Sequence, residues 1–462
     1  MLTYDLTRGT GPLYETLYRL IRSDILAGRL SPGEKLPSKR VLADHLKISK
    51  VTVETAYAQL QAEGYIRSRE KVGYFVEAVE GREPVTGIAP APSPPAPEPE
   101  WTVDLTASSL PETSFPFSVW ARLLRGVMQD YGQELLSAVP NTGALALRQA
   151  IADYLYAFRS MTVSPEQILV GAGTDFLYNL LIQLLGREKR YAVEDPGYRK
   201  ILQVYEAAGA RCLPVPMDGD GLRVDCLADA QIVHLSPSHH FPTGTVMPIV
   251  RRQALLEWAQ AAPGRYLIED DYDSEFRLTG RPIPTLQSID RSGRVIYLNS
   301  FTKSIAPSIR ISYLVLPPEL MELFRQHLGF YACTVPSFEQ YTLSRFLREG
   351  YFEKHVNRMK KRYRDLRDRI LAVLAQSRFA GRIRILGQDS GLHFLVQVQT
   401  QLPDDQLKAL CRKAGVRVQC LSEYYHGASP AVQHCLVVSY SGLEESRLAE
   451  AVSNLEQVFL PE

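Results

Sequence analysis

Residues 36–76 read LPSKRVLADHLKISKVTVETAYAQLQAEGYIRSREKVGYFV, and this stretch decides the fold of the N-terminal part of the chain. Ser38 and Ser49 each stand just before an amphipathic run, where a serine hydroxyl can cap a helix, and Gly64 ends the second run. The residues expected to face inward are Val41, Leu42, Leu46, Val53, Ala56, Tyr57 and Leu60. Two short helices joined by the tight turn KIS predict a helix-turn-helix.

The sequence on either side extends this unit. Upstream, apolar residues recur at helical spacing from Leu13 to Ile25 and stop at Gly28, which predicts a first helix. Downstream, YIRSRE and KVGYFV are expected to form two strands that turn at Glu70 and Lys71. Because this hairpin carries basic side chains, we expect a basic wing beside the helices.

Charge and periodicity alone leave the role of this unit open. Residues 1–79 contain 12 lysines and arginines against 9 aspartates and glutamates, a surplus of three. A plain three-helix bundle would explain the periodicity equally well. A small positive surplus is compatible with nucleic-acid binding but does not require it.

The motif itself is more specific. Residues 36–76 closely resemble the winged-helix domain of the GntR family of bacterial regulators, which we place at residues 12–79. In that family the third helix enters the major groove of operator DNA, and phosphate contacts would dominate affinity. The resemblance implies DNA contacts by Arg40, Lys50, Thr52, Arg69 and Lys71. Glu54 departs from the pattern, because some members carry an arginine facing DNA there, so the base preference cannot be carried over.

Residues 80–100 form a segment of different character. Prolines at positions 84, 90, 92, 94, 95, 97 and 99 remove backbone donors and oppose helix formation. We expect an extended, semi-rigid linker between two domains. The alternative is a proline-rich ligand for a groove on another protein.

The block after the linker, residues 101–462, alternates short β-rich runs with helical stretches, which predicts an α/β domain with a mostly parallel sheet. The runs are QILV, RYAV, QIVHL, RYLI and RVIYL. Polar segments follow them in the order GAGTD, EDPGY, SPSHHFPTG, EDDYDSEF and NSFTKS. Because parallel strands end at one edge of a sheet, these segments should share a crevice.

This crevice offers what a phosphorylated aldehyde cofactor needs. A lone lysine is usually a solvated surface residue, but Lys303 follows an apolar strand, where partial burial would free its amine to form a Schiff base. Ser300, Arg310 and the backbone N–H groups of GAGT could hold a phosphate. The neighbours of the lysine therefore support a role in chemistry.

Three further side chains could contact the cofactor ring. Asp270 could keep a pyridine nitrogen protonated, which strengthens the ring as an electron sink. Tyr272 could donate to the ring hydroxyl. Tyr198 could stack on the ring, or it could be an aromatic core residue at a strand end.

Over nearly all of residues 101–462, these motifs and their order resemble a fold-type I aminotransferase, of the aspartate aminotransferase class. Such a fold has a large α/β domain with a mostly parallel sheet and a smaller C-terminal α+β part, and it binds pyridoxal 5'-phosphate. Joined to the winged helix, the block resembles the MocR/GabR subfamily of GntR-family regulators. The resemblance implies a Schiff base on Lys303 and cofactor contacts by Tyr198, Asp270, Tyr272, Gly173, Thr174, Asp175, Ser300 and Arg310.

Two departures from the aminotransferase pattern concern the substrate. Val437, in LVVSYSG, stands where aminotransferases usually place an arginine that clamps the substrate carboxylate. Loss of such a partner would cost about 2–5 kcal/mol, or a factor of roughly 30 or more in binding. Phe241 stands where many aminotransferases have an asparagine beside the ring hydroxyl. We therefore expect cofactor binding with weak or no transaminase turnover.

The resulting hypothesis is a DNA-binding transcription regulator whose aminotransferase-like domain senses pyridoxal phosphate or an amine effector, working as a homodimer. One alternative is an active aminotransferase that carries a DNA-binding module. Another is a domain whose cofactor pocket is defunct.

Bulk properties fit this hypothesis. A chain of 462 residues with 45% apolar and 22% charged residues suggests two or three globular domains. There is no long apolar run or signal-like N-terminus, so we expect a cytoplasmic protein without a membrane partner. Six cysteines without a C-x-x-C pair suggest no metal site. Because the net charge is +1, DNA binding must come from a local module.

Overall fold

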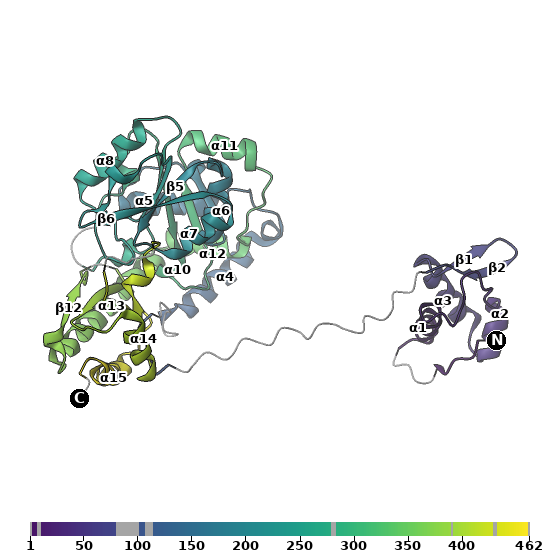
Figure 1. The fold of residues 1–462 in the computed structure, drawn as a ribbon. Coiled ribbons are helices and arrows are strands. Elements are labelled where there is room, and N and C mark those ends of the chain that lie inside the picture. Colours follow the sequence, from purple (N-terminus) through teal and green to yellow (C-terminus); the bar gives the residue numbers. More distant parts are fainter. Residues whose placement is uncertain are drawn as a thin grey trace. The chain divides into compact units, whose positions relative to one another are not determined.

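The computed structural model describes residues 2–6, 11–79, 101–106, 114–278, 283–389, 391–427 and 432–460. The chain divides into two compact units, Met1–Glu98 and Pro99–Glu462 (Figure 1). The expected linker at residues 80–100 lies outside the described residues. Within the described part, no helix is both long enough and apolar enough to cross a membrane.

The N-terminal unit has the predicted order of three helices and a hairpin. Its elements are α1 (Leu13–Leu26), α2 (Lys39–Leu46), α3 (Lys50–Ala62), β1 (Ile66–Arg69) and β2 (Gly73–Val76). The hydroxyl of Ser38 accepts a hydrogen bond from the Val41 N–H group, and that of Ser49 accepts one from the Thr52 N–H group. The two capping serines therefore begin α2 and α3 as the sequence indicated.

The core of this unit lies between α1 and α3. The buried residues of α3 are the predicted ones, Val53, Ala56, Tyr57 and Leu60. The ring of Tyr57 packs edge-on against Tyr74 of β2 with centroids 5.0 Å apart, and its hydroxyl donates to the carbonyl of Pro37. Tyr57 thus fixes the wing against the third helix.

The inward position predicted for Val41 is wrong. Val41 is 45% exposed, whereas Leu42 and Ala43 are buried. An eight-residue helix has only about two turns, so its buried face is narrow. Leu42 and Ala43 occupy the centre of this buried face, so Val41 lies on the outer side of the helix.

The C-terminal unit is built on a large sheet. Among the described residues, eight strands pair in the order β4-β11-β10-β9-β8-β5-β6-β7. Their bounds are β4 (Ile168–Gly171), β5 (Arg190–Asp195), β6 (Arg211–Asp218), β7 (Gly221–Leu222), β8 (Ile232–Leu235), β9 (Tyr266–Asp270), β10 (Val295–Ser300) and β11 (Ser312–Val315). The strands from β10 to β6 run parallel, and β11 is antiparallel to both β10 and β4. Strand β4 therefore ends at the same edge as the parallel strands.

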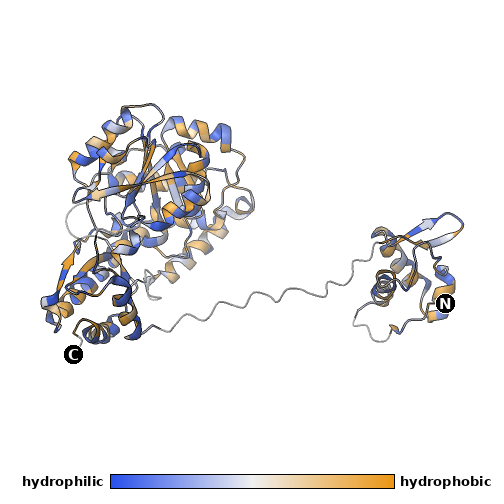
Figure 2. Cartoon of the chain, in the orientation of Figure 1, coloured by the Kyte–Doolittle hydropathy of each residue, from blue (hydrophilic) through white to orange (hydrophobic). Residues whose placement is uncertain are grey.

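Helices cover both faces of this sheet (Figure 1). One face packs against α6 (Thr174–Leu185), α7 (Arg199–Ala207) and α11 (Pro318–Leu328). The other packs against α5 (Leu145–Arg159), α8 (Ile249–Gln260), α9 (Leu286–Ile289) and α12 (Ser337–Arg348), with α4 (Phe117–Tyr131) beside α12. The helices carry both hydrophobic and hydrophilic residues, as helices with one buried face do (Figure 2).

A smaller α+β part completes the unit. Its sheet has the order β12 (Ile383–Leu386), β13 (His393–Val398), β16 (Cys435–Ser439) and β15 (Gln419–Cys420). It packs with α13 (Tyr351–Gln376), α14 (Asp404–Lys413) and α15 (Leu448–Phe459), while β14 (Val416–Arg417) pairs with β3 (Val103–Asp104). This architecture is the predicted α/β fold with a smaller C-terminal part.

Candidate functional site

Asp270 lies at the end of β9 and is held by two aromatic side chains from neighbouring elements. Its Oδ2 accepts a hydrogen bond of 2.6 Å from the Tyr178 hydroxyl of α6 and lies 3.4 Å from Nε2 of His234. The Nδ1 of His234 lies 2.6 Å from the Tyr205 hydroxyl. A chain of polar contacts thus fixes the orientation of the Asp270 carboxylate.

The second oxygen of this carboxylate is buried but unpaired. Asp270 is 5% exposed, and among the described residues its Oδ1 has no hydrogen-bond partner. A buried acceptor without a partner costs about 1–3 kcal/mol. A ligand that presents an N–H donor at this position would remove that cost, so the site fits a protonated pyridine nitrogen.

Lys303 lies in α10 (Phe301–Ser304), the short helix that follows β10. Burial lowers the pKa of its ammonium group below the ordinary value, an effect that the Asp273 carboxylate partly offsets. A lysine with a lowered pKa has more free amine at neutral pH and is a better nucleophile. The environment of Lys303 therefore suits covalent binding of an aldehyde.

The N-terminus of α6 forms a cradle beside Arg310. Gly173 stands at the N-cap position with φ of 89°, and a Cβ atom there would collide with the Arg310 guanidinium group. Thr174 begins the helix. Helix N–H groups and an arginine together suit a phosphate dianion.

Two other residues expected to contact the cofactor already have protein partners. The Asp175 carboxylate lies 2.7 Å from the Lys200 ammonium group and 3.5 Å from the Arg310 guanidinium group. The Ser300 hydroxyl caps α10 and donates to the Thr302 hydroxyl over 2.7 Å. Asp175 is thus placed to orient the cations, and Thr302 brings a hydroxyl that sequence reasoning did not identify.

Tyr272 belongs to a buried cluster that joins the large and small parts of the unit. Its hydroxyl lies 3.1 Å from Nδ1 of His239, which is 2.9 Å from Oδ2 of Asp273. His239, Asp273 and His393 of β13 each offer one atom of a kind that can bind a metal ion, and these three atoms lie within 4.8 Å of one another. Nε2 of His393 also lies 3.1 Å from the Pro242 carbonyl, whereas Nε2 of His239 is buried without a hydrogen-bond partner among the described residues.

The position of Tyr198 leaves both of its interpretations open. It precedes α7 and is 46% exposed, and its ring stands edge-on to Phe241 at 5.9 Å. Phe241 also contacts the rings of His393 and Tyr424. An aromatic group therefore covers the place where an asparagine was expected from the family.

Val437 lies in the apolar cluster that contacts Phe241. The cluster consists of Leu395, Leu421, Tyr424, Cys435 and Val437, with Phe241, Leu386, Tyr425 and Val432 packed against it. Val437 is 2% exposed. None of these side chains carries a formal charge, so this wall of the site offers no clamp for a carboxylate.

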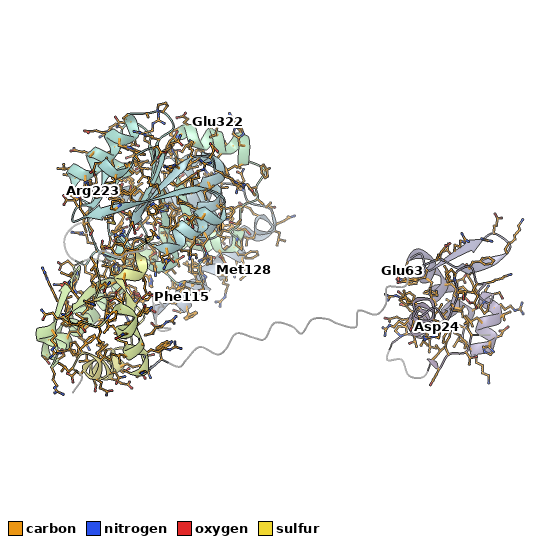
Figure 3. All side chains as sticks on the ribbon, in the orientation of Figure 1. Asp24, Glu63, Phe115, Met128, Arg223 and Glu322 are labelled. Atoms are coloured by element: carbon orange, nitrogen blue, oxygen red, sulfur yellow. The ribbon has the colours of Figure 1, made fainter. Side chains whose placement is uncertain are left out.

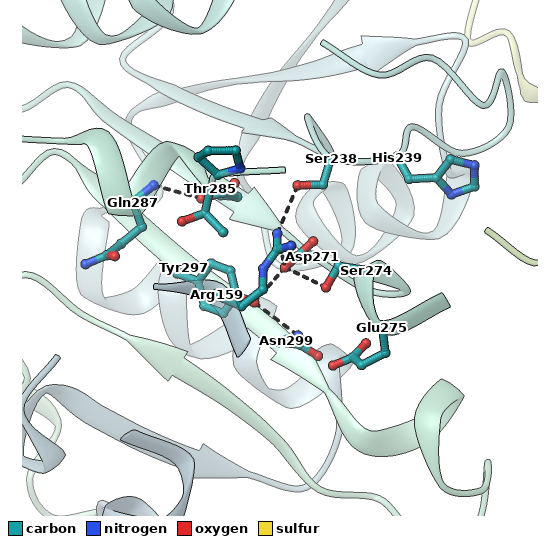
Figure 4. A network of polar contacts seen from close by, with 12 residues as sticks. Arg159, Ser238, His239, Asp271, Ser274, Glu275, Thr285, Gln287, Tyr297 and Asn299 are labelled. Atoms are coloured by element: carbon teal, nitrogen blue, oxygen red, sulfur yellow. Dashed lines mark hydrogen bonds and ion pairs between the residues drawn. The ribbon is translucent and has the colours of Figure 1, made fainter. Parts of the chain in front are cut away.

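A second acidic residue, Asp271, organises a network beneath the site (Figure 4). Its Oδ2 lies 2.8 Å from the Arg159 guanidinium group, and both side chains are almost fully buried. The same oxygen accepts hydrogen bonds from Tyr297 and Ser274, and Arg159 donates to Ser238. The network ties the end of α5 to the segments after β8 and β9, which carry His239 and Tyr272.

Sequence reasoning missed this network, although a signal for it existed. Successive residues of a strand face opposite sides of the sheet, so the neighbours Asp270 and Asp271 cannot share a role. Asp270 faces α6, whereas Asp271 faces Arg159 at the end of α5. Strand alternation across EDD could therefore have predicted one ligand-facing and one structural carboxylate.

The basic residues expected at a DNA interface lie on three elements of the N-terminal unit. Arg40 of α2 and Lys50, the first residue of α3, are exposed. Thr52 is half-buried, and its hydroxyl lies 2.7 Å from that of Ser49. Arg69 ends β1 with its guanidinium over the Phe75 ring, so the candidates fall on the helix-turn-helix and the wing.

Comparison with known proteins agrees with both halves of this description. The sequence model of the bacterial regulatory proteins of the gntR family matches residues 13–76. That of the class I and II aminotransferases matches residues 106–455.

Several relatives match over nearly the whole chain. An uncharacterized HTH-type transcriptional regulator of Bacillus subtilis, YdeL, is 37% identical over 96% of both chains. A probable rhizopine catabolism regulatory protein of Rhizobium meliloti, MocR, is 32% identical over 97% of this chain and 94% of its own. The pyridoxine biosynthesis transcriptional regulator PdxR of Corynebacterium glutamicum is 30% identical over 88% of this chain and 87% of its own.

Solved structures share the fold of the C-terminal unit. The kynurenine aminotransferase of Pyrococcus horikoshii has a TM-score of 0.69 and 23% identity, over 78% of this chain and 91% of that one. LysN, the alpha-aminoadipate aminotransferase of Thermus thermophilus, has a TM-score of 0.67 and 23% identity, over 77% of this chain and 92% of that one. With a winged helix followed by an aminotransferase fold, and full-length relatives that are HTH-type regulators, the chain belongs to the MocR/GabR type of GntR-family transcription regulators.

Proposed function

We propose that the C-terminal unit binds pyridoxal phosphate through Lys303, and that the cofactor or an amine effector controls operator binding by the winged helix. The unpaired Oδ1 of buried Asp270 carries this proposal, because it lies at the strand edge that also bears Lys303. If no cofactor were bound, the Oδ1 atom of Asp270 would stay buried without a hydrogen-bond donor among the described residues.

Each candidate residue has a separate task in this proposal. The bound cofactor supplies an aldehyde carbon and an electron-withdrawing ring. Lys303 offers the amine that bonds to it, and Asp270 accepts a hydrogen bond from the pyridine nitrogen. The phosphate is held by Arg310 and the N-terminus of α6, with Tyr198 and Tyr272 beside the ring.

The apolar wall around Val437 favours sensing over turnover. An amino-acid substrate brings an α-carboxylate, and burying that group against Phe241 and Val437 without a cation would be unfavourable. The signal is therefore pyridoxal phosphate itself or an amine that lacks an α-carboxylate.

Spectroscopy of the purified protein tests cofactor binding. We expect visible absorbance from pyridoxal phosphate that is lost in Lys303→Ala. Lys189→Ala is a matched control, because burial also lowers the pKa of Lys189 but this residue precedes β5, at the opposite edge of the sheet. Absence of absorbance from the wild-type protein would support a defunct pocket instead.

Turnover assays with a panel of amino acids separate a regulator from an enzyme. We expect at most a slow half-reaction and no sustained transamination. Sustained turnover would favour the alternative of an active aminotransferase that carries a DNA-binding module.

Each part of the chain has its own role in the proposed function. Residues 12–79 bind operator DNA through Arg40, Lys50, Thr52, Arg69 and Lys71. Residues 80–100 link this domain to residues 101–462, which bind the cofactor, and the protein acts in the cytoplasm. Large apolar side chains are exposed on α4, on the segment after it and at the start of α5, which supports a homodimer; they are Phe117, Met128, Leu136 and Leu145. Light scattering coupled to gel filtration should give the mass of two chains.

A further inference from the structure

The outer face of α3 combines an exposed apolar residue with an acidic one. Val51 is 68% exposed, and the side chain of Glu54 is 50% exposed three residues later on the same helix. Positions three apart lie on one face of a helix. This face is opposite to the stripe that packs in the core, so it is available to a partner.

Glu54 is held in place by a cation from α2. Its Oε1 lies 2.8 Å from the Lys39 ammonium group, which also sits over the Tyr74 ring of the wing at 5.3 Å. The hydrogen bond from Lys39 lowers the pKa of Glu54 below its ordinary value. Glu54 is therefore ionised and can only accept hydrogen bonds.

A carboxylate on this face restricts which part of DNA it can meet. Phosphates repel it, whereas base edges in the major groove include amino donors. Glutamate there accepts a hydrogen bond from N4 of cytosine. The ion pair with Lys39 offsets the repulsion and leaves the Oε2 of Glu54 for a base.

We propose that Glu54 is a specificity-determining residue that accepts a hydrogen bond from a cytosine amino group in each operator half-site. The inference rests on the proposed operator binding by the winged helix. Lys39 acts as a positioning residue, since it orients the carboxylate from outside the groove.

Selection from random duplex DNA tests this inference with the full chain. The wild-type protein should enrich a sequence motif in which one position, or column of the aligned sequences, is cytosine. The base in that column should depend on residue 54. Glu54→Gln should change that column to adenine and Glu54→Arg to guanine, because those side chains match these bases. The other columns should stay the same.

A matched control lies at the end of the same helix. Glu63, labelled in Figure 3, follows α3 at its C-terminal end, and its carboxylate accepts hydrogen bonds from Tyr18 of α1 and from Gln59. Glu63→Gln makes the same chemical change away from the outer face. It should leave every column of the motif unchanged.

Binding measurements on the selected duplex give the size of the effect. Replacing the cytosine–guanine pair should weaken wild-type binding by roughly 5- to 150-fold, and should weaken binding by Glu54→Gln much less. Identical motifs from the wild type and both Glu54 variants would overturn the inference and leave Glu54 only as a partner of Lys39. Failure of the wild type to enrich any motif would instead contradict operator binding itself.

Discussion

At the residue scale, Glu194 shows how burial sets protonation near the site. This residue lies near the end of β5, and its Oε2 accepts a hydrogen bond of 3.0 Å from the Ser236 N–H group. Its Oε1 has no partner among the described residues. Burial raises the pKa of Glu194 to about 8. The folded protein therefore keeps this carboxyl group protonated at neutral pH.

This protonation should make stability depend on pH. The unfolded chain loses the Glu194 proton near pH 4.5, whereas the folded chain keeps it until about pH 8. Because the folded state binds more protons in this window, stability falls as the pH rises through it. We expect Glu194→Gln to lack this loss, so its advantage in melting temperature over the wild type should grow from about pH 5 to pH 9.

Calorimetry at several pH values measures this difference. Glu322→Gln is the control, because the Glu322 side chain is 58% exposed and should leave the pH profile unchanged. A constant difference between Glu194→Gln and the wild type across the window would contradict a raised pKa.

Gly173 makes a second prediction at the residue scale. In Gly173→Ala, the new Cβ would displace the Arg310 guanidinium group and strain a backbone with φ of 89°. We expect affinity for pyridoxal phosphate to fall at least about tenfold, because a charge-assisted contact is worth about 1.5–3 kcal/mol. Equilibrium titration by absorbance measures this loss.

Gly209 provides a control with the same backbone cost. Its φ is 84°, and a Cβ there would meet nothing within 4 Å. Gly209→Ala should lower stability about as much while leaving cofactor affinity intact. If the two variants bind the cofactor equally well, the cradle is misassigned.

At the scale of elements, the wing hairpin combines a charge with a strained turn. The turn between β1 and β2 places Lys71 at φ of 57°, a left-handed conformation that costs a residue with a side chain about 1 kcal/mol or more. A glycine would adopt it freely. The lysine at this position is therefore better explained by its charge than by the needs of the turn.

Two substitutions separate these roles of Lys71. Lys71→Ala and Lys71→Gly should both weaken DNA binding evenly across sequences and reduce the salt dependence by about one charge. Only Lys71→Gly should also raise the melting temperature of the N-terminal unit. Binding isotherms at several salt concentrations, together with thermal melts, distinguish the outcomes, and unchanged salt dependence would remove Lys71 from the interface.

At the scale of the whole molecule, a ligand at Lys303 can change DNA affinity only if it binds two arrangements of the chain with different affinity. The Tyr272, His239, Asp273 and His393 cluster lies where the large and small parts meet, so a cofactor bound beside Tyr272 would contact both parts. A change of arrangement could begin at this junction.

Operator affinity should therefore depend on the cofactor. We expect pyridoxal phosphate to change the dissociation constant for DNA by about 5- to 150-fold, which is the range of ordinary allosteric coupling. Footprinting on the DNA upstream of the protein's own gene, with and without cofactor, provides the first measurement. Lys303→Ala should not respond, and equal affinity for the wild type in both conditions would refute cofactor sensing.

The sequence by itself determined the elements and singled out the candidate site residues. Serine caps, apolar periodicity and the polar segments after strands are local signals, so α2, α3, the wing and the position of Lys303 could all be predicted. The sequence also has an apolar residue, Val437, where the resemblance implies an arginine, and an apolar residue cannot act as a cationic clamp.

Only the tertiary structure decided how side chains from distant segments pair. Arg159 meets Asp271 across 112 positions of sequence, His239 meets Asp273 and His393, and Lys39 meets Glu54. Such pairings depend on strand order, on which face a side chain occupies and on helix length, and Val41 was misplaced for this last reason. Periodicity describes one element at a time, whereas the burial and partner of a charge depend on how the elements pack.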